Sequence, residues 1–345
     1  MKQKRMKIRE MIIWLCGVVL LSWLTFHVLL TDHSIELLKE AFLKADLRFL
    51  LPGIVCMFLV VNCEAANIRL LMRTFQQKVP YIRSLAYTFS GVYFSAITPS
   101  ATGGQPMQLY YMTRDGLGVG QSSFTLLAVA AVYQMTILVY GTGMVLLNLS
   151  LCMSQGRLIQ WLLILGLLVN GFCSGLILLT IFNRVPAEGI LRRIIGLLCK
   201  MKVLRDRKKA EERMVEIIEE YSQGGVYLRK YPLVIGKMFL YAVAQLTCLY
   251  LVPWFAARSL GFDINPGRVL SLQAILSLAV TAIPLPGSVG ASEGVFMTLY
   301  RSLLGSEQSF LVLVLGRGIS FYGTLVVSGL ITAIFQFKGK RSLFE

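Results

Sequence analysis

The stretch AVTAIPLPGSVGASEGVF, residues 279–296, decides how this chain folds. Pro284 and Pro286 each remove a backbone donor, and the glycines of the stretch permit turns that other residues resist. These residues therefore predict a broken helix inside an apolar region. In a membrane, broken backbone is tolerated only where it is buried in protein or lines a wet cavity. We hypothesise that Glu293, the carboxylate of this stretch, lies in a substrate cavity.

The composition places the chain in the membrane class. Of its 345 residues, 56% are hydrophobic and 15% are charged, and the mean hydropathy is +0.67. The net charge of +16 resides in short segments beside apolar runs and no nucleic-acid motif accompanies it, so we expect no nucleic-acid partner. The seven cysteines include no CxxC pair, and neither histidine lies near a nucleophile motif. We expect no cofactor, metal or catalytic residue.

The apolar runs predict an all-α polytopic membrane protein that forms a single domain over residues 1–345. Two apolar regions, residues 84–112 and 269–304, are interrupted by Pro and Gly into pieces of about half the ~20 residues that a span requires. They predict re-entrant hairpins or broken helices. Within the domain, residues 183–235 predict an amphipathic, basic cytoplasmic loop. About six full spans are expected, at residues 11–30, 50–72, 121–151, 158–182, 236–257 and 310–337.

The distribution of Lys and Arg predicts the orientation, because cytoplasmic loops carry an excess of these residues. The bias is clear if the N-terminus is cytoplasmic and each interrupted region enters and leaves on one side. The C-terminus is then cytoplasmic too, and the two hairpins enter from opposite sides as an inverted repeat. Such repeats are typical of transporters, whose sites lie where the repeats meet.

Ionisable residues inside spans are candidates for function because they are costly to place there. Glu64, in VVNCEAANIRLL, either belongs to a site or forms an ion pair with a distant Arg. Arg317, in VLVLGRGISFYG, either pairs with Glu293 or Glu64, or binds a lipid phosphate directly. Ser288 and Ser292 are further polar groups of the second interrupted segment. Tyr133 and Gln134 are weaker candidates, better explained by packing and interhelical hydrogen bonds.

The first interrupted segment concentrates small and polar residues in SAITPSATGGQPMQLYY, residues 95–111. Small residues let the backbone approach a ligand closely, and exposed amides can hold an anion such as phosphate. A purely structural hairpin tip is the alternative. The candidate residues here are Thr98, Pro99, Gly103, Gly104 and Gln105.

At SAITPSATGGQPMQLYYM (residues 95–112) and PLPGSVGASEG (residues 284–294), followed by Arg317, the sequence resembles the transmembrane flippase-like family of lysylphosphatidylglycerol synthases. This family is the membrane half of the multiple peptide resistance factor. The resemblance implies movement of aminoacylated phosphatidylglycerol, or a related lipid, between the leaflets of a bacterial plasma membrane. That movement would contribute to resistance against cationic antimicrobial peptides. The implied binding residues are Glu64, Thr98, Pro99, Gly103, Gly104, Gln105, Gly287, Gly290, Glu293 and Arg317.

One departure from the family concerns catalysis. Full-length members continue into a soluble domain that takes lysine from charged transfer RNA, whereas this sequence stops at Glu345. A name such as phosphatidylglycerol lysyltransferase could be inherited, yet we expect no site for that reaction here. The alternative function is the membrane component of a lysyltransferase whose catalytic domain is on another chain. A lipid-binding scaffold is a third hypothesis, and a homo-oligomer is also compatible with the sequence.

Overall fold

The computed structural model describes residues 45–98, 101–153, 156–183, 207–280 and 290–337, with the isolated residues 43, 189 and 193. Within these ranges the chain is helical and contains no strand, which confirms the all-α prediction. The helices are α3 (Leu47–Thr74), α4 (Tyr81–Ala96), α5 (Gly104–Arg114), α6 (Val119–Leu147), α7 (Leu149–Met153), α8 (Arg157–Phe182), α10 (Arg207–Lys230), α11 (Pro232–Ser259), α12 (Pro266–Val280), α13 (Ala291–Leu304), α14 (Ser306–Arg317), η3 (Gly318–Gly323) and α15 (Thr324–Phe337).

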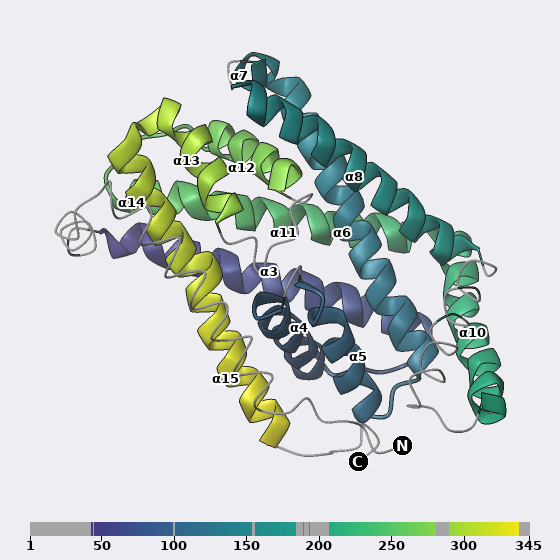
Figure 1. Ribbon diagram of the computed structural model, residues 1–345. Coiled ribbons are helices and arrows are strands. Elements are labelled where there is room, and N and C mark those ends of the chain that lie inside the picture. The colour runs from purple at the N-terminus through teal and green to yellow at the C-terminus, as the bar shows by residue number, and fades with distance from the viewer. Residues whose placement is uncertain are drawn as a thin grey trace.

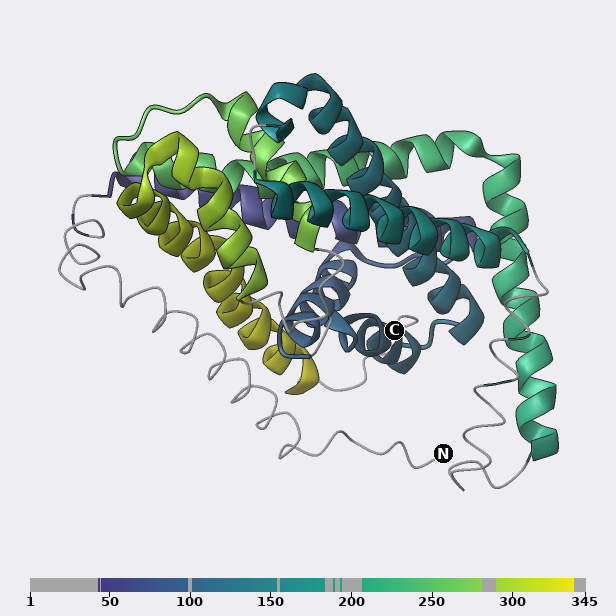
Figure 2. The same ribbon diagram turned by 45° about the horizontal axis from the view of Figure 1, so that its top comes forward.

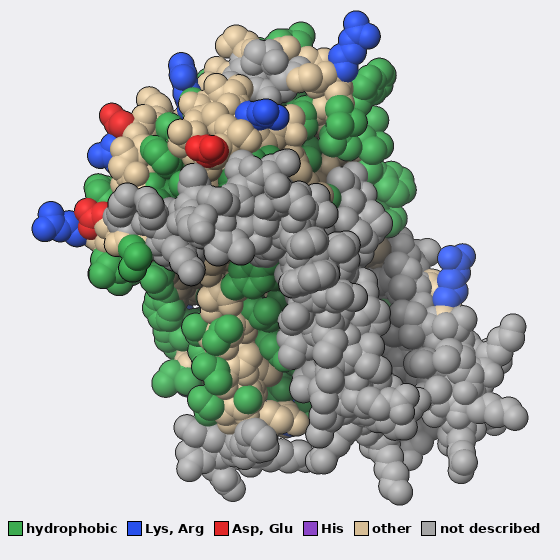
Figure 3. Space-filling model, turned by 60° about the vertical axis from the view of Figure 1, so that its left-hand side comes forward, with side chains coloured by type: hydrophobic (Ala, Val, Ile, Leu, Met, Phe, Trp, Pro, Cys, Tyr) green, Lys and Arg blue, Asp and Glu red, His purple; other side chains and the backbone are tan. Residues whose placement is uncertain are grey.

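Five described helices are long and apolar enough to cross a membrane: α3, α6, α8, α11 and the continuous helix Ser306–Gln336 that α14, η3 and α15 form. They correspond to five of the six expected spans, and the sixth, at residues 11–30, lies outside the described residues. The outer face of α8 exposes large apolar side chains, among them Trp161, Leu168 and Phe172. Figure 3 shows green hydrophobic side chains on the flank of the molecule, below a group of charged side chains at the upper end of the view. Such a flank suits contact with lipid tails.

The helices α3 and α11 form an antiparallel pair through the middle of the molecule (Figures 1 and 2). At one end of the pair, the amide of Asp46 donates to the carbonyl of Ser259 at 2.8 Å. Toward the other end, the side chain of Asn67 donates to the carbonyl of Met238 at 3.4 Å. The pair therefore places the start of α3 beside the end of α11, and both interrupted hairpins follow directly from its two helices.

Both interrupted regions are broken helices, as the proline and glycine pattern predicts. In the first, α4 ends at Ala96 and α5 begins at Gly104; in the second, α12 ends at Val280 and α13 begins at Ala291. Gly104 allows α4 and α5 to approach closely, because a Cβ atom there would lie 2.0 Å from Ser95 Oγ. Residues 99–100 and 281–289, which include parts of both connections, lie outside the described residues.

The two hairpins join the bundle at opposite ends. At the base of the first hairpin, Arg114 Nη2 donates to the Phe335 carbonyl at 3.3 Å, near the C-terminal end of the long helix Ser306–Gln336. The second hairpin passes through Gly305 into the N-terminal end of that same helix. In Figure 1, α4 and α5 accordingly lie toward the lower end of the bundle and α12 and α13 toward the upper end. This arrangement agrees with hairpins that enter from opposite sides.

We call the end at the base of the first hairpin the basic end, because it carries Arg69, Arg73, Lys78, Arg83 and Arg114.

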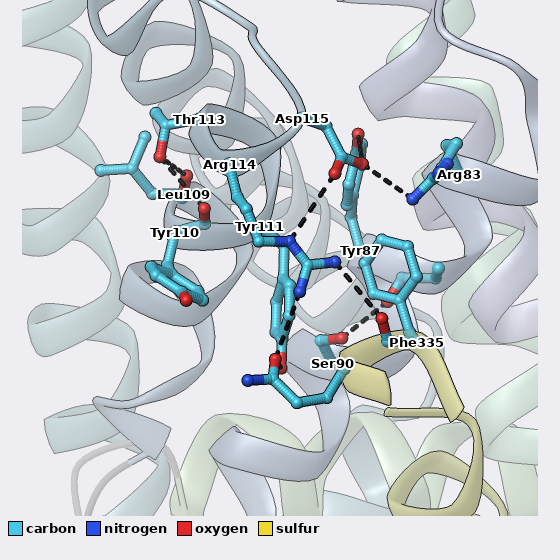
Figure 4. A network of polar contacts seen from close by, with 12 residues as sticks. Arg83, Tyr87, Ser90, Leu109, Tyr110, Tyr111, Thr113, Arg114, Asp115 and Phe335 are labelled. Carbon is cyan, nitrogen blue, oxygen red and sulfur yellow. Dashed lines mark hydrogen bonds and ion pairs between the residues drawn. The ribbon is translucent and has the colours of Figure 1, made fainter. Parts of the chain in front are cut away.

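A buried carboxylate at the basic end ties the first hairpin together (Figure 4). Asp115 Oδ2 accepts hydrogen bonds from Arg83 Nη1 at 3.1 Å and from Tyr87 Oη at 2.8 Å. The guanidinium of Arg114 lies 3.7 Å from Asp115 Oδ1 and stacks over the rings of Tyr111 and Phe335. The Asp115 side chain is fully buried, and a buried charge is costly unless it is paired. The two arginines supply the opposite charge. The network fixes the base of the hairpin to the end of α15.

The helix α10 occupies part of the predicted cytoplasmic loop and docks against α6 and α8. Glu220 Oε2 accepts from the amide of Gly120 at 2.9 Å, at the N-terminal end of α6, where a negative charge is favoured. The hydroxyl of Tyr221 donates to the Thr180 carbonyl at 3.4 Å. Burial among these helices raises the pKa of Tyr221 to about 12.

Candidate functional site

An ion pair inside the helix bundle forms the centre of the candidate site. Glu293 Oε1, in the first turn of α13, lies 2.8 Å from Arg317 Nε at the end of α14. Arg317 Nη2 also donates to Ser292 Oγ, and that hydroxyl donates in turn to Glu293 Oε2 at 3.0 Å. The Glu293 side chain is 5% exposed and that of Arg317 is 19% exposed. Of the alternatives open for Arg317, the structure therefore shows pairing with Glu293.

The backbone of the second hairpin orients Glu293. Gly290 adopts a φ of 89°, a left-handed conformation that glycine tolerates, and begins the turn into α13. Its amide donates to Glu293 Oε2 at 2.6 Å, which satisfies a free donor at the helix start. Both oxygens of the carboxylate are thus engaged, one by Arg317 and one by the helix start. Gly287 and Ser288, also predicted at this site, lie outside the described residues.

Arg317 lies well inside the span that carries it. It is the twelfth residue of the helix Ser306–Gln336, which places it about 17 Å from the helix start. The following turn, Gly318–Gly323, is a π-helix, and such turns are frequent at functional sites. The Arg317 guanidinium lies 5.7 Å from the centre of the Phe321 ring in this turn. The wider turn and the flanking Gly316 and Gly318 give this cation room beside the helix.

A cavity of about 320 Å³ adjoins the ion pair. Arg317 and Ser292 line it, whereas Glu293 lies behind them. The other polar groups in the described part of its wall are Tyr133, Tyr250, Gln273, Ser277 and Ser320. Apolar side chains from α6, α11, α12, α13 and α14 complete the wall. A largely apolar concavity with a few convergent polar groups is the usual form of a ligand site.

Several of these wall residues were not predicted as site residues from the sequence. Tyr133 is assigned to packing by the sequence, yet it lines the cavity. Gln273 donates to the hydroxyl of Tyr300 at 3.0 Å, which fixes its side chain in the wall. The sequence does show that each of these residues is a polar residue within an apolar helix. The spacing of residues along a helix, however, does not tell whether such a side chain faces a cavity or a neighbouring helix. For Gln134 the packing interpretation is correct, because it donates to Asn170 on α8.

Glu64 forms a second polar pair, separate from Arg317. Its Oε1 accepts from Gln108 Nε2 at 2.8 Å, so a carboxylate of α3 is held by an amide of α5. Among the described residues Glu64 has no cationic partner, so the alternative of an ion pair with a distant Arg finds no support there. Glu64 is absent from the described wall of the cavity at Arg317. The two carboxylates therefore have different partners, Gln108 for Glu64 and Arg317 for Glu293.

The tip of the first hairpin is built mainly by its own contacts. Thr98 Oγ1 donates to the Phe94 carbonyl at 2.6 Å and accepts from the Gly103 amide at 2.9 Å. A Cβ atom on Gly103 would lie 2.6 Å from the methyl group of Thr98, so this glycine is required by the turn. Gln105 is exposed. Thr98, Gly103, Gly104 and Gln105 are absent from the described cavity wall, and Pro99 lies outside the described residues.

The described wall offers hydrogen-bond donors beside an apolar surface. Arg317 has five N–H donors, and its contacts with Glu293 and Ser292 engage two of them within the described residues. The remaining donors of Arg317 suit the oxygens of an anionic group such as a phosphate.

Comparison with known proteins gives two similarities. A family model for the lysylphosphatidylglycerol synthase TM region matches residues 12–328. A UPF0104 membrane protein from Archaeoglobus fulgidus is 25% identical over 265 residues, which cover 75% of this chain and 77% of that protein. The matched residues of the family model include both interrupted hairpins and Arg317.

Proposed function

The chain belongs to the lysylphosphatidylglycerol synthase TM region family, and we propose that it moves a phospholipid between the two leaflets of a membrane. The proposed substrate is an aminoacylated phosphatidylglycerol or a related anionic or zwitterionic lipid. The observation that carries this proposal is the cavity beside Arg317 and Ser292, which offers a cation and hydroxyl groups inside a span. A head group needs such a polar environment while it crosses the hydrocarbon core.

The proposed route keeps the lipid tails outside the protein. The phosphate binds the donors of Arg317 that Glu293 and Ser292 leave unused within the described residues. An amino group on the same head group is attracted by Glu64, whose carboxylate lacks a cationic partner among the described residues. Because the hairpins join the bundle at opposite ends, small shifts of each would open the cavity toward one leaflet at a time. The predicted residues of the hairpin tips then act by shaping this opening.

The proposed location is a bacterial plasma membrane, with the basic end and both termini in the cytoplasm. Five arginine and lysine side chains at the base of the first hairpin support this orientation. Movement of an aminoacylated lipid to the outer leaflet would reduce the negative surface charge there. Cationic antimicrobial peptides would then bind less, which is the proposed contribution to antibiotic resistance.

Reconstitution of the full chain into vesicles tests the proposal. Lysyl-phosphatidylglycerol is incorporated, and a membrane-impermeant amine reagent reports the fraction that reaches the outer leaflet over time. We expect faster exchange than in protein-free vesicles, and at least a ~10-fold slower rate for Arg317→Gln, since a charge-assisted hydrogen bond is worth about 1.5–3 kcal/mol. Arg268→Gln, which removes an exposed cation, should match the wild type.

Two results would count against lipid movement. The first is a wild-type rate equal to that of protein-free vesicles for lysyl-phosphatidylglycerol, phosphatidylglycerol and phosphatidylcholine alike. The second is an unchanged rate in Arg317→Gln protein that elutes as a folded species.

A second candidate function is the membrane component of a lysyltransferase whose catalytic domain is on another chain. The description of the family as the TM region of a synthase favours it. In that case lysyl-phosphatidylglycerol formation in cells would require this chain, and a soluble synthase would copurify with it. Vesicle exchange by the purified chain alone, without such a partner, would favour lipid movement instead.

A further inference from the structure

A second cavity lies at the basic end, at the C-terminal end of α3. Its volume is about 600 Å³. Three of the side chains that line it are cations: Arg69 and Arg73, four residues apart on α3, and Lys78 in the connection to α4. The rest of the described wall consists of Gln76, Gln77, Val79 and Pro80. It shares no described residue with the cavity at Arg317.

The chain folds back over the end of α3 to build this cavity. The Gln76 amide donates to the Arg73 carbonyl at 3.0 Å, and the Gln77 amide to the Met72 carbonyl at 3.1 Å. This pattern is a Schellman motif, in which the residue at the Gln76 position is usually glycine. Gln76 adopts a φ of 59° there, which is uncommon for a residue with a side chain. Val79 is buried, and its amide donates to the Gln77 carbonyl at 3.2 Å.

The three cations have no counter-charge in the described part of the chain. The ion pairs found there join Arg83 and Arg114 to Asp115, Arg258 to Asp263, and Arg317 to Glu293. The C-terminal end of α3 carries about half a negative charge, which cannot balance three positive ones. This cluster therefore carries excess positive charge around a space large enough for a ligand group.

Arg69 is partly enclosed by the protein at the edge of this cavity. Its Nε is buried and has no hydrogen-bond partner within the described residues. The Arg69 side chain is part-exposed and lines the cavity, so the positive charge of its guanidinium acts on a ligand held there together with the charges of Arg73 and Lys78.

The depth of the cavity indicates the class of ligand. The helix α3 has 28 residues and is about 42 Å long, compared with a hydrocarbon core of about 30 Å. Its last turns, with Arg69 and Arg73, therefore reach the level of the lipid head groups. The abundant anion at that level is the phosphodiester of a phospholipid, and the planar guanidinium matches its oxygens.

We propose that Arg69, Arg73 and Lys78 bind the phosphate of an anionic phospholipid in the leaflet at the basic end. This lipid site is separate from the central cavity, and it exists whether or not the protein moves lipids. Basic pockets between transmembrane helices bind anionic head groups in the same way.

Native mass spectrometry of the purified full chain in detergent tests the site. Dioleoyl phosphatidylglycerol and dioleoyl phosphatidylcholine are added in turn, and the fraction of lipid-bound protein is measured. We expect the wild type to prefer phosphatidylglycerol, and Arg69→Gln and Arg73→Gln each to reduce its affinity at least tenfold. The matched control is Arg268→Gln, which removes an exposed cation near the opposite end and should bind like the wild type.

Three results would overturn the proposal. One is equal phosphatidylglycerol binding by Arg69→Gln, Arg73→Gln and Arg268→Gln. Another is displacement of the lipid by inorganic phosphate at equal concentration, which would assign the site to free phosphate. The third is a lower melting temperature of Arg69→Gln in lipid-free detergent, because a side chain that serves a ligand should not stabilise the lipid-free fold. An unchanged lipid-free melting temperature together with lost lipid stabilisation would support the site.

Discussion

Neutralising Glu293 or Arg317 should destabilise the protein, and neutralising both should cost little more than neutralising one. Their atoms lie 2.8 Å apart, with Glu293 almost fully buried and Arg317 open to the cavity. Two unit charges about 4 Å apart attract by about 4 kcal/mol at an effective dielectric constant of ~20. Removing one partner of a buried pair costs about 3–5 kcal/mol, and water in the cavity places Arg317 at the lower limit, about 3 kcal/mol.

A double-mutant cycle measures this coupling. The free energy of unfolding is determined in mixed detergent micelles for the wild type, Glu293→Gln, Arg317→Gln and the double variant. We expect each single variant to lose about 3 kcal/mol and the double variant to lose a similar amount, so the coupling is about 2–3 kcal/mol. The effects should not add, because the double variant leaves no uncompensated charge.

A control cycle uses Arg258 and Asp263, an ion pair at the surface whose side chains are 32% and 90% exposed. Water screens both charges, so we expect no measurable coupling between Arg258→Gln and Asp263→Asn. Additive losses at Glu293 and Arg317 would refute the assignment of a buried, mutually compensating pair. So would equal coupling in the two cycles.

Three further predictions concern the rest of the fold. Gly104→Ala should cost about 1–3 kcal/mol in a thermal unfolding assay, because its Cβ would lie 2.0 Å from a neighbouring Oγ. Gly143→Ala, in open space within α6, should instead be neutral or stabilise the protein by up to about 1 kcal/mol in the same assay. Tyr87→Phe should cost about 1–3 kcal/mol by removing a donor to buried Asp115, measured as unfolding in mixed micelles. The free energy of unfolding should fall as pH rises from about 10 to about 12, because the Tyr221 phenol loses its proton in the unfolded chain at a lower pH than in the folded protein. Melting temperatures measured across this pH range should fall less for Tyr221→Phe than for the wild type.

The spans and the two breaks could be predicted because they depend on local chemistry. A run of about 20 apolar residues suffices for a span, and proline and glycine limit the backbone wherever they occur. The breaks after Ala96 and Val280 therefore lie where the sequence predicts them. Glu293 and Arg317 were identifiable for a related reason, since an ionisable residue in an apolar run is costly in any fold.

The partners of those residues could not be predicted, because each contact joins helices that are distant in sequence. Arg317 had two candidate carboxylates, and the packing of α13 against α14 selects Glu293. Glu64 is instead held by Gln108, 44 residues away on α5. Thr98 differs from these residues, because its partners are close in sequence. The small and polar residues of its segment suggested a ligand contact, whereas its hydroxyl forms hydrogen bonds within its own turn.

The sequence alone determined that this chain is a helical membrane protein with two broken hairpins and a buried cation, because hydropathy and backbone limits act residue by residue. Tertiary structure alone decided which side chains meet. The Glu293–Arg317 pair, the cavity wall at Tyr133 and Gln273, and the unpaired Nε of Arg69 all depend on how the helices pack. The angles and distances at which helices pack are determined by many weak contacts at once, and no single stretch of sequence encodes them.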